Sequence, residues 1–86
     1  MSLRGSIAVS TAGRDRNKVF IIVGVLDEKY VLIANGKSRK IEKPKKKKLK
    51  HLKAVGKDSS ATRLLNEGKL TNKTAAKITV SYHIVL

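Results

Sequence analysis

The chain has 86 residues, and its 20 Lys and Arg residues outnumber its 6 Asp and Glu residues to give a net charge of +14. A chain of this length forms one small domain that buries only about 60% of its unfolded surface, so we do not expect a deep substrate cavity. The absence of cysteine excludes disulfides, thiolate-bound zinc, iron–sulfur clusters and thiol catalysis. Because like-charge repulsion destabilises a compact fold, a net charge this high points to an anionic partner.

The positive charge is concentrated in the middle of the chain. Residues 1–36 and residues 58–86 each have a net charge of only +2, whereas residues 37–57 combine eleven basic residues with Glu42 for a net charge of +10. The densest part, residues 43–53, includes four consecutive lysines. We therefore expect this segment to be the main electrostatic feature of the surface.

Five short β-prone runs separated by polar turns occupy the first two thirds of the chain, at residues 7–10, 19–26, 30–34, 39–42 and 49–55. A turn rich in Gly, Arg, Asp and Asn follows the first run, and Asn35-Gly36 predicts a tight hairpin because both residues tolerate positive φ. Short strands at this spacing favour a mainly β fold, a small antiparallel barrel. The second run is apolar on both faces, so its outer face needs a cover.

The last third of the chain predicts two helices. Asp58 is a start signal for the first helix, an apolar stripe follows it, and Gly68 is a stop signal. Thr71 can cap a second helix, on one face of which lie Ala75, Ile78, Tyr82 and Val85. A strand is the alternative for this segment, because apolar residues also alternate at Ile78, Val80, Tyr82, Ile84 and Leu86. We divide the chain into a barrel over residues 1–57 and a short helical appendage over residues 58–86 that packs on it.

Residues 9–25 resemble a KOW motif, with a strand, a basic turn centred on Gly13 and a long hydrophobic strand. Their continuation, residues 30–36, resembles the aliphatic run and Asn-Gly hairpin of the KOW ribosomal proteins of the large-subunit fourteen-e type. The chain is especially similar to the short KOW-domain RNA-binding proteins of bacteria. The resemblance implies an SH3-like barrel that binds ribosomal or other structured RNA. Asn17 stands where the family usually has a second glycine, a mild departure because Asn tolerates left-handed φ.

We expect the basic residues to form one continuous face that binds the phosphate backbone of RNA. Arginine suits bidentate phosphate contacts, and lysine ammonium groups replace the counterions of a polyanion. The first turn contributes Arg14, Arg16 and Lys18. The central segment contributes Lys37, Arg39, Lys40, Lys43, Lys45, Lys46, Lys47, Lys48, Lys50 and Lys53. Alternate lysines of an extended chain point to opposite sides, so four in a row cannot contact one backbone equally.

Two simpler interpretations of these residues remain open. The lysine run can be a solvated, disordered stretch, and Arg14 and Arg16 can neutralise Asp15 within their own turn. Aromatic residues are few, and Phe20 is predicted to be in the core, so we expect no base-stacking platform of the RRM or OB kind. RNA recognition would then depend on shape and backbone.

The function favoured by these observations is that of a cytoplasmic RNA-binding protein associated with the ribosome, with ribosomal RNA as its partner. One alternative is a KOW factor of transcription or translation coupling that binds nascent nucleic acid or polymerase; another is a polybasic adaptor for an acidic protein surface. The scattered acids and histidines predict no catalytic residues, no metal, no cofactor and no small-molecule substrate. The longest apolar run, residues 19–26, is too short to cross a bilayer, so no membrane partner is expected.

Overall fold

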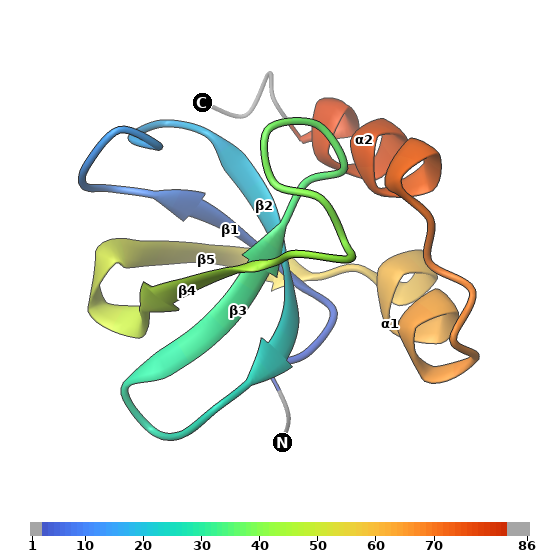
Figure 1. The fold of residues 1–86 in the computed structure, drawn as a ribbon, viewed down its shortest axis with the longest axis horizontal. Coiled ribbons are helices and arrows are strands. Elements are labelled where there is room, and N and C mark those ends of the chain that lie inside the picture. Colours follow the sequence, from blue (N-terminus) through green and yellow to red (C-terminus); the bar gives the residue numbers. More distant parts are fainter. Residues whose placement is uncertain (1–2, 83–86) are drawn as a thin grey trace.

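The computed structural model describes residues 3–82, which form a five-stranded antiparallel sheet with two helices on one side of it (Figure 1). In chain order the elements are β1 (Ser6–Ser10), β2 (Val19–Val25), β3 (Tyr30–Ala34), β4 (Lys45–Lys48), β5 (Leu52–Lys57), α1 (Ser59–Asn66) and α2 (Asn72–Ser81). A 3-10 turn, η1 (Leu49–His51), joins β4 to β5. The fold is mainly β, as predicted.

The sheet has the order β4-β3-β2-β1-β5, and each neighbouring pair is antiparallel. β4 and β5 are its two edges, and within residues 3–82 no ladder joins them. The sheet is thus not closed, and the predicted SH3-like barrel is not confirmed. Residues 11–18 leave β1 at the end where β5 begins, because Ser10 is the register partner of Leu52.

Both faces of β2 are buried over its first four residues, and each face has its own apolar cluster. On one face Phe20 and Ile22 pack with Ala8, Val31 and Ile33. On the other face Val19 and Ile21 pack with Ile7, Val9, Ala61 and Ala75. The last two residues belong to α1 and α2, so the helices cover this face of the sheet. The two-sided apolar pattern of β2 follows from this layered arrangement.

The helices begin at the residues that the sequence indicates. The side chain of Asp58 accepts the backbone N–H of Ala61 at 2.8 Å, and that of Thr71 accepts the N–H of Thr74 at 3.2 Å. These side chains satisfy donors that the first turn of a helix leaves unpaired. The predicted second helix is confirmed over Asn72–Ser81, and the alternative of a strand there is wrong. Residues 83–86, which include Val85, lie outside the described residues.

The predicted strand at residues 39–42 is wrong, because the strand that pairs with β3 is β4, in the lysine run itself. Asn35 explains the difference. Its side-chain oxygen accepts the backbone N–H groups of Lys37 and Arg39, each at 3.0 Å. These bonds close a wider loop than the two-residue hairpin that Asn-Gly predicts, so the return strand starts later.

The loop between β3 and β4 lies against the start of α2. The backbone N–H of Ile41 donates to the side-chain oxygen of Asn72 at 2.8 Å, and the Asn72 amide donates to Glu42 at 2.6 Å. Gly36 has a φ of +76° and touches the Asn72 carbonyl so closely that no side chain fits there. The loop therefore bonds to its own first residues and to the start of α2, and does not continue the ladder with β3.

Candidate nucleic-acid interface

The turn at residues 11–18 is a compact structure that turns one acidic side chain inward. Gly13 and Asn17 both have positive φ, +77° and +70°. The N–H of Asn17 returns to the carbonyl of Ser10 at 2.8 Å, and the N–H of Lys18 donates to the carbonyl of Asp15 at 2.9 Å. This path leaves Arg14 exposed on one side of Asp15 and Arg16 exposed on the other, while Asp15 is buried.

Asp15 gathers cations from three separate segments. Its side chain is only 3% exposed, and its carboxylate lies 2.6 Å from Lys45 Nζ, 3.5 Å from Arg39 and 3.8 Å from Lys18. Lys18 belongs to the first turn, Arg39 to the β3–β4 loop and Lys45 to β4. We call these four residues the Asp15 cluster. The first turn and the central basic segment thus meet on one part of the surface.

The charges around Asp15 also fix its ionisation. Burial on its own would raise the pKa of the carboxyl group. The hydrogen bond from Lys45 and the positive charges of Lys45, Arg39 and Lys18 outweigh that effect and hold the pKa of Asp15 below its ordinary value. Asp15 is therefore the anion that allows three cations to lie side by side.

The four lysines of β4 divide between the two faces of the strand. Lys45 binds Asp15, and Lys47 is buried with its Nζ donating to the carbonyl of Ala12 at 3.0 Å. Lys46 and Lys48 point the other way and are exposed. The lysine run is thus an ordered strand in this structure, and two of its four ammonium groups hold the first turn in place.

The outward lysines lie next to Tyr30, at the start of β3. Tyr30 is the register partner of Lys48, and the ammonium group of Lys46 lies 4.3 Å from the centre of the Tyr30 ring. A hollow of about 560 Å³ borders the half-buried Tyr30. Its other lining residues are Glu28, Lys29, Lys48, Leu49 and Lys50.

The remaining predicted residues lie around these two features. Lys18 and Lys37 line a hollow of about 290 Å³ beside α2. The Lys40 ammonium donates to the carbonyl of Gly36 at 3.1 Å, which keeps this lysine on its own loop. Lys43, Lys50 and Lys53 are exposed.

The start of β5 is close to the first turn as well. The N–H of Thr11 donates to the carbonyl of His51 at 2.8 Å, and Lys53 is the register partner of Val9. Lys50 and Lys53 therefore belong to the segment of η1 and β5 that lies next to the first turn.

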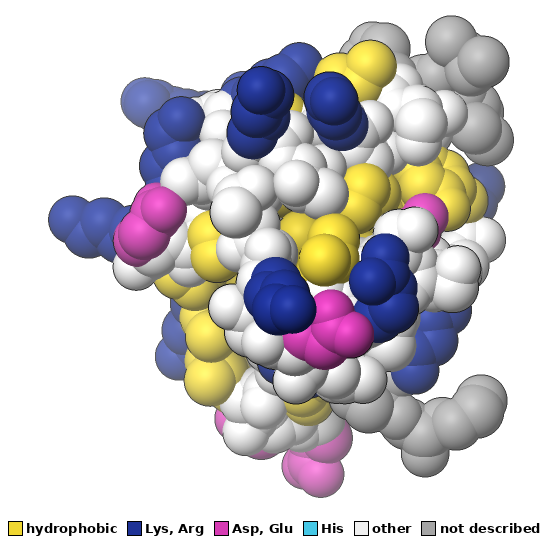
Figure 2. All heavy atoms as spheres, turned by 90° about the vertical axis from the view of Figure 1, so that its right-hand side faces the viewer, with side chains coloured by type: hydrophobic (Ala, Val, Ile, Leu, Met, Phe, Trp, Pro, Cys, Tyr) yellow, Lys and Arg dark blue, Asp and Glu magenta, His cyan; other side chains and the backbone are white. Residues whose placement is uncertain are grey.

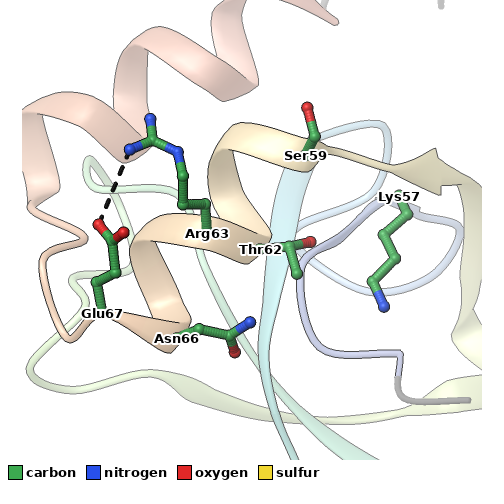
Figure 3. Close-up of a pocket in the computed structure, with 6 residues that line it drawn as sticks. All are labelled: Lys57, Ser59, Thr62, Arg63, Asn66 and Glu67. Atoms are coloured by element: carbon green, nitrogen blue, oxygen red, sulfur yellow. Dashed lines mark ion pairs between the residues drawn. The ribbon is translucent and has the colours of Figure 1, made fainter.

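The helix side of the molecule is different in character. Figure 2 shows that basic, acidic and hydrophobic side chains are interspersed there. A hollow of about 550 Å³ beside α1 is lined by both signs of charge, and Figure 3 shows Arg63 turned toward Glu67, with 3.8 Å between their charged groups. Lys57, at the edge of this hollow, pairs with Ser6, so the hollow lies at the opposite end of β1 from the first turn.

Three features of the interface could not be located from the sequence. The interpretation in which Arg14 and Arg16 neutralise Asp15 is wrong, because the carboxylate pairs with Lys18, Arg39 and Lys45. Lys45 and Lys47 of the lysine run point inward because of partners that lie about thirty residues away in the sequence. The third feature is the position of Tyr30 beside the lysines, because the sequence shows only that Tyr30 starts a β-prone run.

Residues 3–82 contain neither a metal-binding cluster of side chains nor a membrane-spanning helix. No group of three or more His, Cys, Asp or Glu side chains is placed there to hold a metal ion. Neither of the helices in this part of the chain is long and apolar enough to cross a membrane.

Comparison with known proteins finds one likeness of note. The chain is 40% identical over 53 residues to the large ribosomal subunit protein eL14 of Desulfurococcus amylolyticus. The match covers 62% of this chain and 55% of the archaeal protein, so the chain spans about half the length of the relative. No family model matches the chain.

Proposed function

We propose that the protein binds structured RNA, above all ribosomal RNA, through the phosphate backbone, as a non-catalytic KOW-type component associated with ribosomes in the cytoplasm. The observation that carries this proposal is the Asp15 cluster, which brings cations of three segments onto one surface. The likeness to eL14, a protein of the large ribosomal subunit by name, supports the same function. The positive φ of Gly13 and Asn17 agrees with the resemblance of this turn to that of the short KOW proteins of bacteria.

In this proposal some basic residues contact RNA directly and others only position those that do. Arg14 and Arg16 project from a rigid turn, and their planar guanidinium groups suit bidentate contacts with phosphate oxygens. Lys46 and Lys48 offer two more positive charges on the outward face of β4. Lys45 and Lys47 act indirectly, because their ammonium groups already bind Asp15 and the Ala12 carbonyl. The contacts with RNA would be chiefly electrostatic, so affinity should fall steeply with salt.

Salt-dependent binding to a structured RNA tests the proposal. Each neutralised phosphate contributes about −0.7 to −0.9 to the slope of log affinity against log salt. We expect the pair of substitutions Lys46→Ala and Lys48→Ala to weaken binding to all RNAs and to flatten this slope by about 1.5. Lys69→Ala with Lys77→Ala removes the same charge from exposed positions outside the basic segment and is the matched control. Equal effects of the two pairs would mean that net charge alone, and no defined surface, drives binding.

Association with ribosomes is tested by sedimentation of a native extract at low salt. We expect the protein to sediment with ribosomal particles and to move to the free pool after ribonuclease treatment. A protein that stays in the free pool, with or without ribonuclease, contradicts the ribosomal part of the proposal.

A further inference from the structure

Tyr30 occupies an unusual place for an aromatic residue in a molecule with this much positive charge. Its ring lies beside Lys46, at 4.3 Å from the ammonium group, and it borders the hollow of about 560 Å³ at the β4–η1 corner. Tyr30 lines the hollow and Lys46 does not. The ring is half-buried and thus positioned by the strand, yet part of it is open to a ligand.

The chemistry of the hollow fits one nucleotide. Its volume is within the range of small-ligand sites, about 300–1,000 Å³. Tyr30 and Leu49 provide apolar surface, and three lysines, Lys29, Lys48 and Lys50, outnumber the carboxylate of Glu28 in the lining. Their ammonium groups can contact the phosphates on either side of a base. A flat ring next to cations is the combination by which proteins hold an unstacked base of a single strand.

We propose that this hollow receives one unpaired nucleotide of the bound RNA, whose base stacks on the Tyr30 ring while its neighbouring phosphates meet Lys48 and Lys50. This inference rests on the proposed function and makes it narrower. A helix of fully paired RNA leaves the hollow empty, because its bases are stacked inside the duplex. A bulge or loop can fill it, so the preferred RNA is a helix with an extruded base next to the basic surface.

A pair of RNA hairpins tests this inference. One carries a single bulged 2-aminopurine, and the other has the same sequence with the 2-aminopurine paired in the stem. At one fixed salt concentration we expect the bulged hairpin to bind about tenfold more tightly, since stacking of one base on an aromatic side chain raises affinity by a factor of about 5 to 150. Binding should also change the fluorescence of the bulged 2-aminopurine, which reports its new stacking partner.

Two substitutions at one position identify the ring as the cause. Tyr30→Leu keeps an apolar side chain of similar size but removes the flat ring, and it should abolish the preference for the bulged hairpin without changing the affinity for the paired one. Tyr30→Phe keeps the ring and should keep the preference. If Tyr30→Leu does not fold, as thermal unfolding will reveal, the preference and fluorescence change of the unaltered protein decide the matter.

The outcomes separate this inference from the proposed function. Equal binding of the two hairpins by the unaltered protein, or an undiminished preference in Tyr30→Leu, overturns the inference and leaves the proposed function standing. Failure to bind either hairpin at low salt overturns the proposed function itself.

Discussion

Replacing Asp15 by Asn should lower the stability of the protein and, at the same time, raise its affinity for RNA. The substitution keeps the shape of the side chain but removes the negative charge that faces Lys45, Arg39 and Lys18. A hydrogen bond to a charged group contributes about 1.5–3 kcal/mol, which applies to the 2.6 Å contact with Lys45. The two longer ion pairs add about 0–1 kcal/mol each, because Arg39 and Lys18 are 37% and 49% exposed.

We therefore expect the Asp15→Asn variant to lose about 2 kcal/mol, since the amide oxygen still accepts one hydrogen bond. For a domain of about this size the loss lowers the midpoint of thermal unfolding by about 8–16 °C. Circular dichroism measures the midpoint, and Lys45→Met provides the control. In a Lys45→Met background the same substitution should cost clearly less, because the principal partner is gone.

The pH dependence gives an independent check of the same reasoning. The pKa of Asp15 is lower in the folded protein than its ordinary value of 3.8, so its contribution to stability is complete above that value and is lost as the pH falls through the folded pKa. The stability difference between the unaltered protein and Asp15→Asn should be constant near neutral pH and should shrink in strong acid. A difference that does not change down to the acid limit of folding would refute this account of the cluster.

The effect on RNA has the opposite sign. Removing the carboxylate raises the net charge by one and frees the cations of the cluster for phosphate, so affinity should rise several-fold at low salt and the salt dependence should steepen. Weaker binding by a variant that is fully folded at the assay temperature would mean that Asp15 orients the cations and that this orientation matters more than their number.

Three further substitutions test other parts of the structure. Tyr82→Phe removes the hydroxyl that donates to Asp58 at 2.6 Å and should lower the free energy of unfolding by about 1–2 kcal/mol; because that hydrogen bond raises the pKa of Tyr82, the loss should disappear as the pH rises above the folded pKa. Gly36→Ala should cost at least about 2 kcal/mol, measured by urea unfolding, because alanine is strained at a φ of +76° and its methyl group would overlap the start of α2. Lys46→Met should weaken RNA binding and flatten its salt dependence, whereas Lys47→Met should leave the salt dependence unchanged and lower the thermal stability, because the Lys47 ammonium is buried against the first turn; an equal flattening by both substitutions would contradict the division of β4 into two faces.

Elements that depend on local rules could be predicted closely from the sequence. β3 has the predicted bounds, and β2 differs from its prediction by one residue at its end, because β-branched and aromatic residues dominate both runs. Asp58 and Thr71 could be predicted as helix N-caps, because a short polar side chain just before an apolar stripe is a typical helix start. For the last segment the helix prevails over the strand because its apolar face has Val19 and Ile21 to pack against.

Elements that depend on distant partners could not be predicted. Nothing in the local sequence marks Lys45–Lys48 as a strand, since lysine is a poor strand former and the run has no apolar alternation. The strand forms because Val31 and Ile33 of β3 supply a paired, buried neighbour and because Asp15 compensates the charge. The positive charge of the site could be predicted from composition. The arrangement of its side chains could not, because it depends on contacts between residues about thirty positions apart in the sequence.

The lysines of β4 also affect what can pair with the edge of the sheet. Unpaired N–H and C=O groups at a sheet edge can recruit another chain, and charged side chains on the edge oppose such pairing. The outer side of β4 is such an edge. Because Lys46 and Lys48 are exposed on this strand, a second copy approaching the edge meets like charge, whereas a polyanion meets attraction. The alternation of one strand therefore gives the run two tasks: Lys45 and Lys47 hold the first turn, and the outward charges of Lys46 and Lys48 oppose pairing of the edge with another copy.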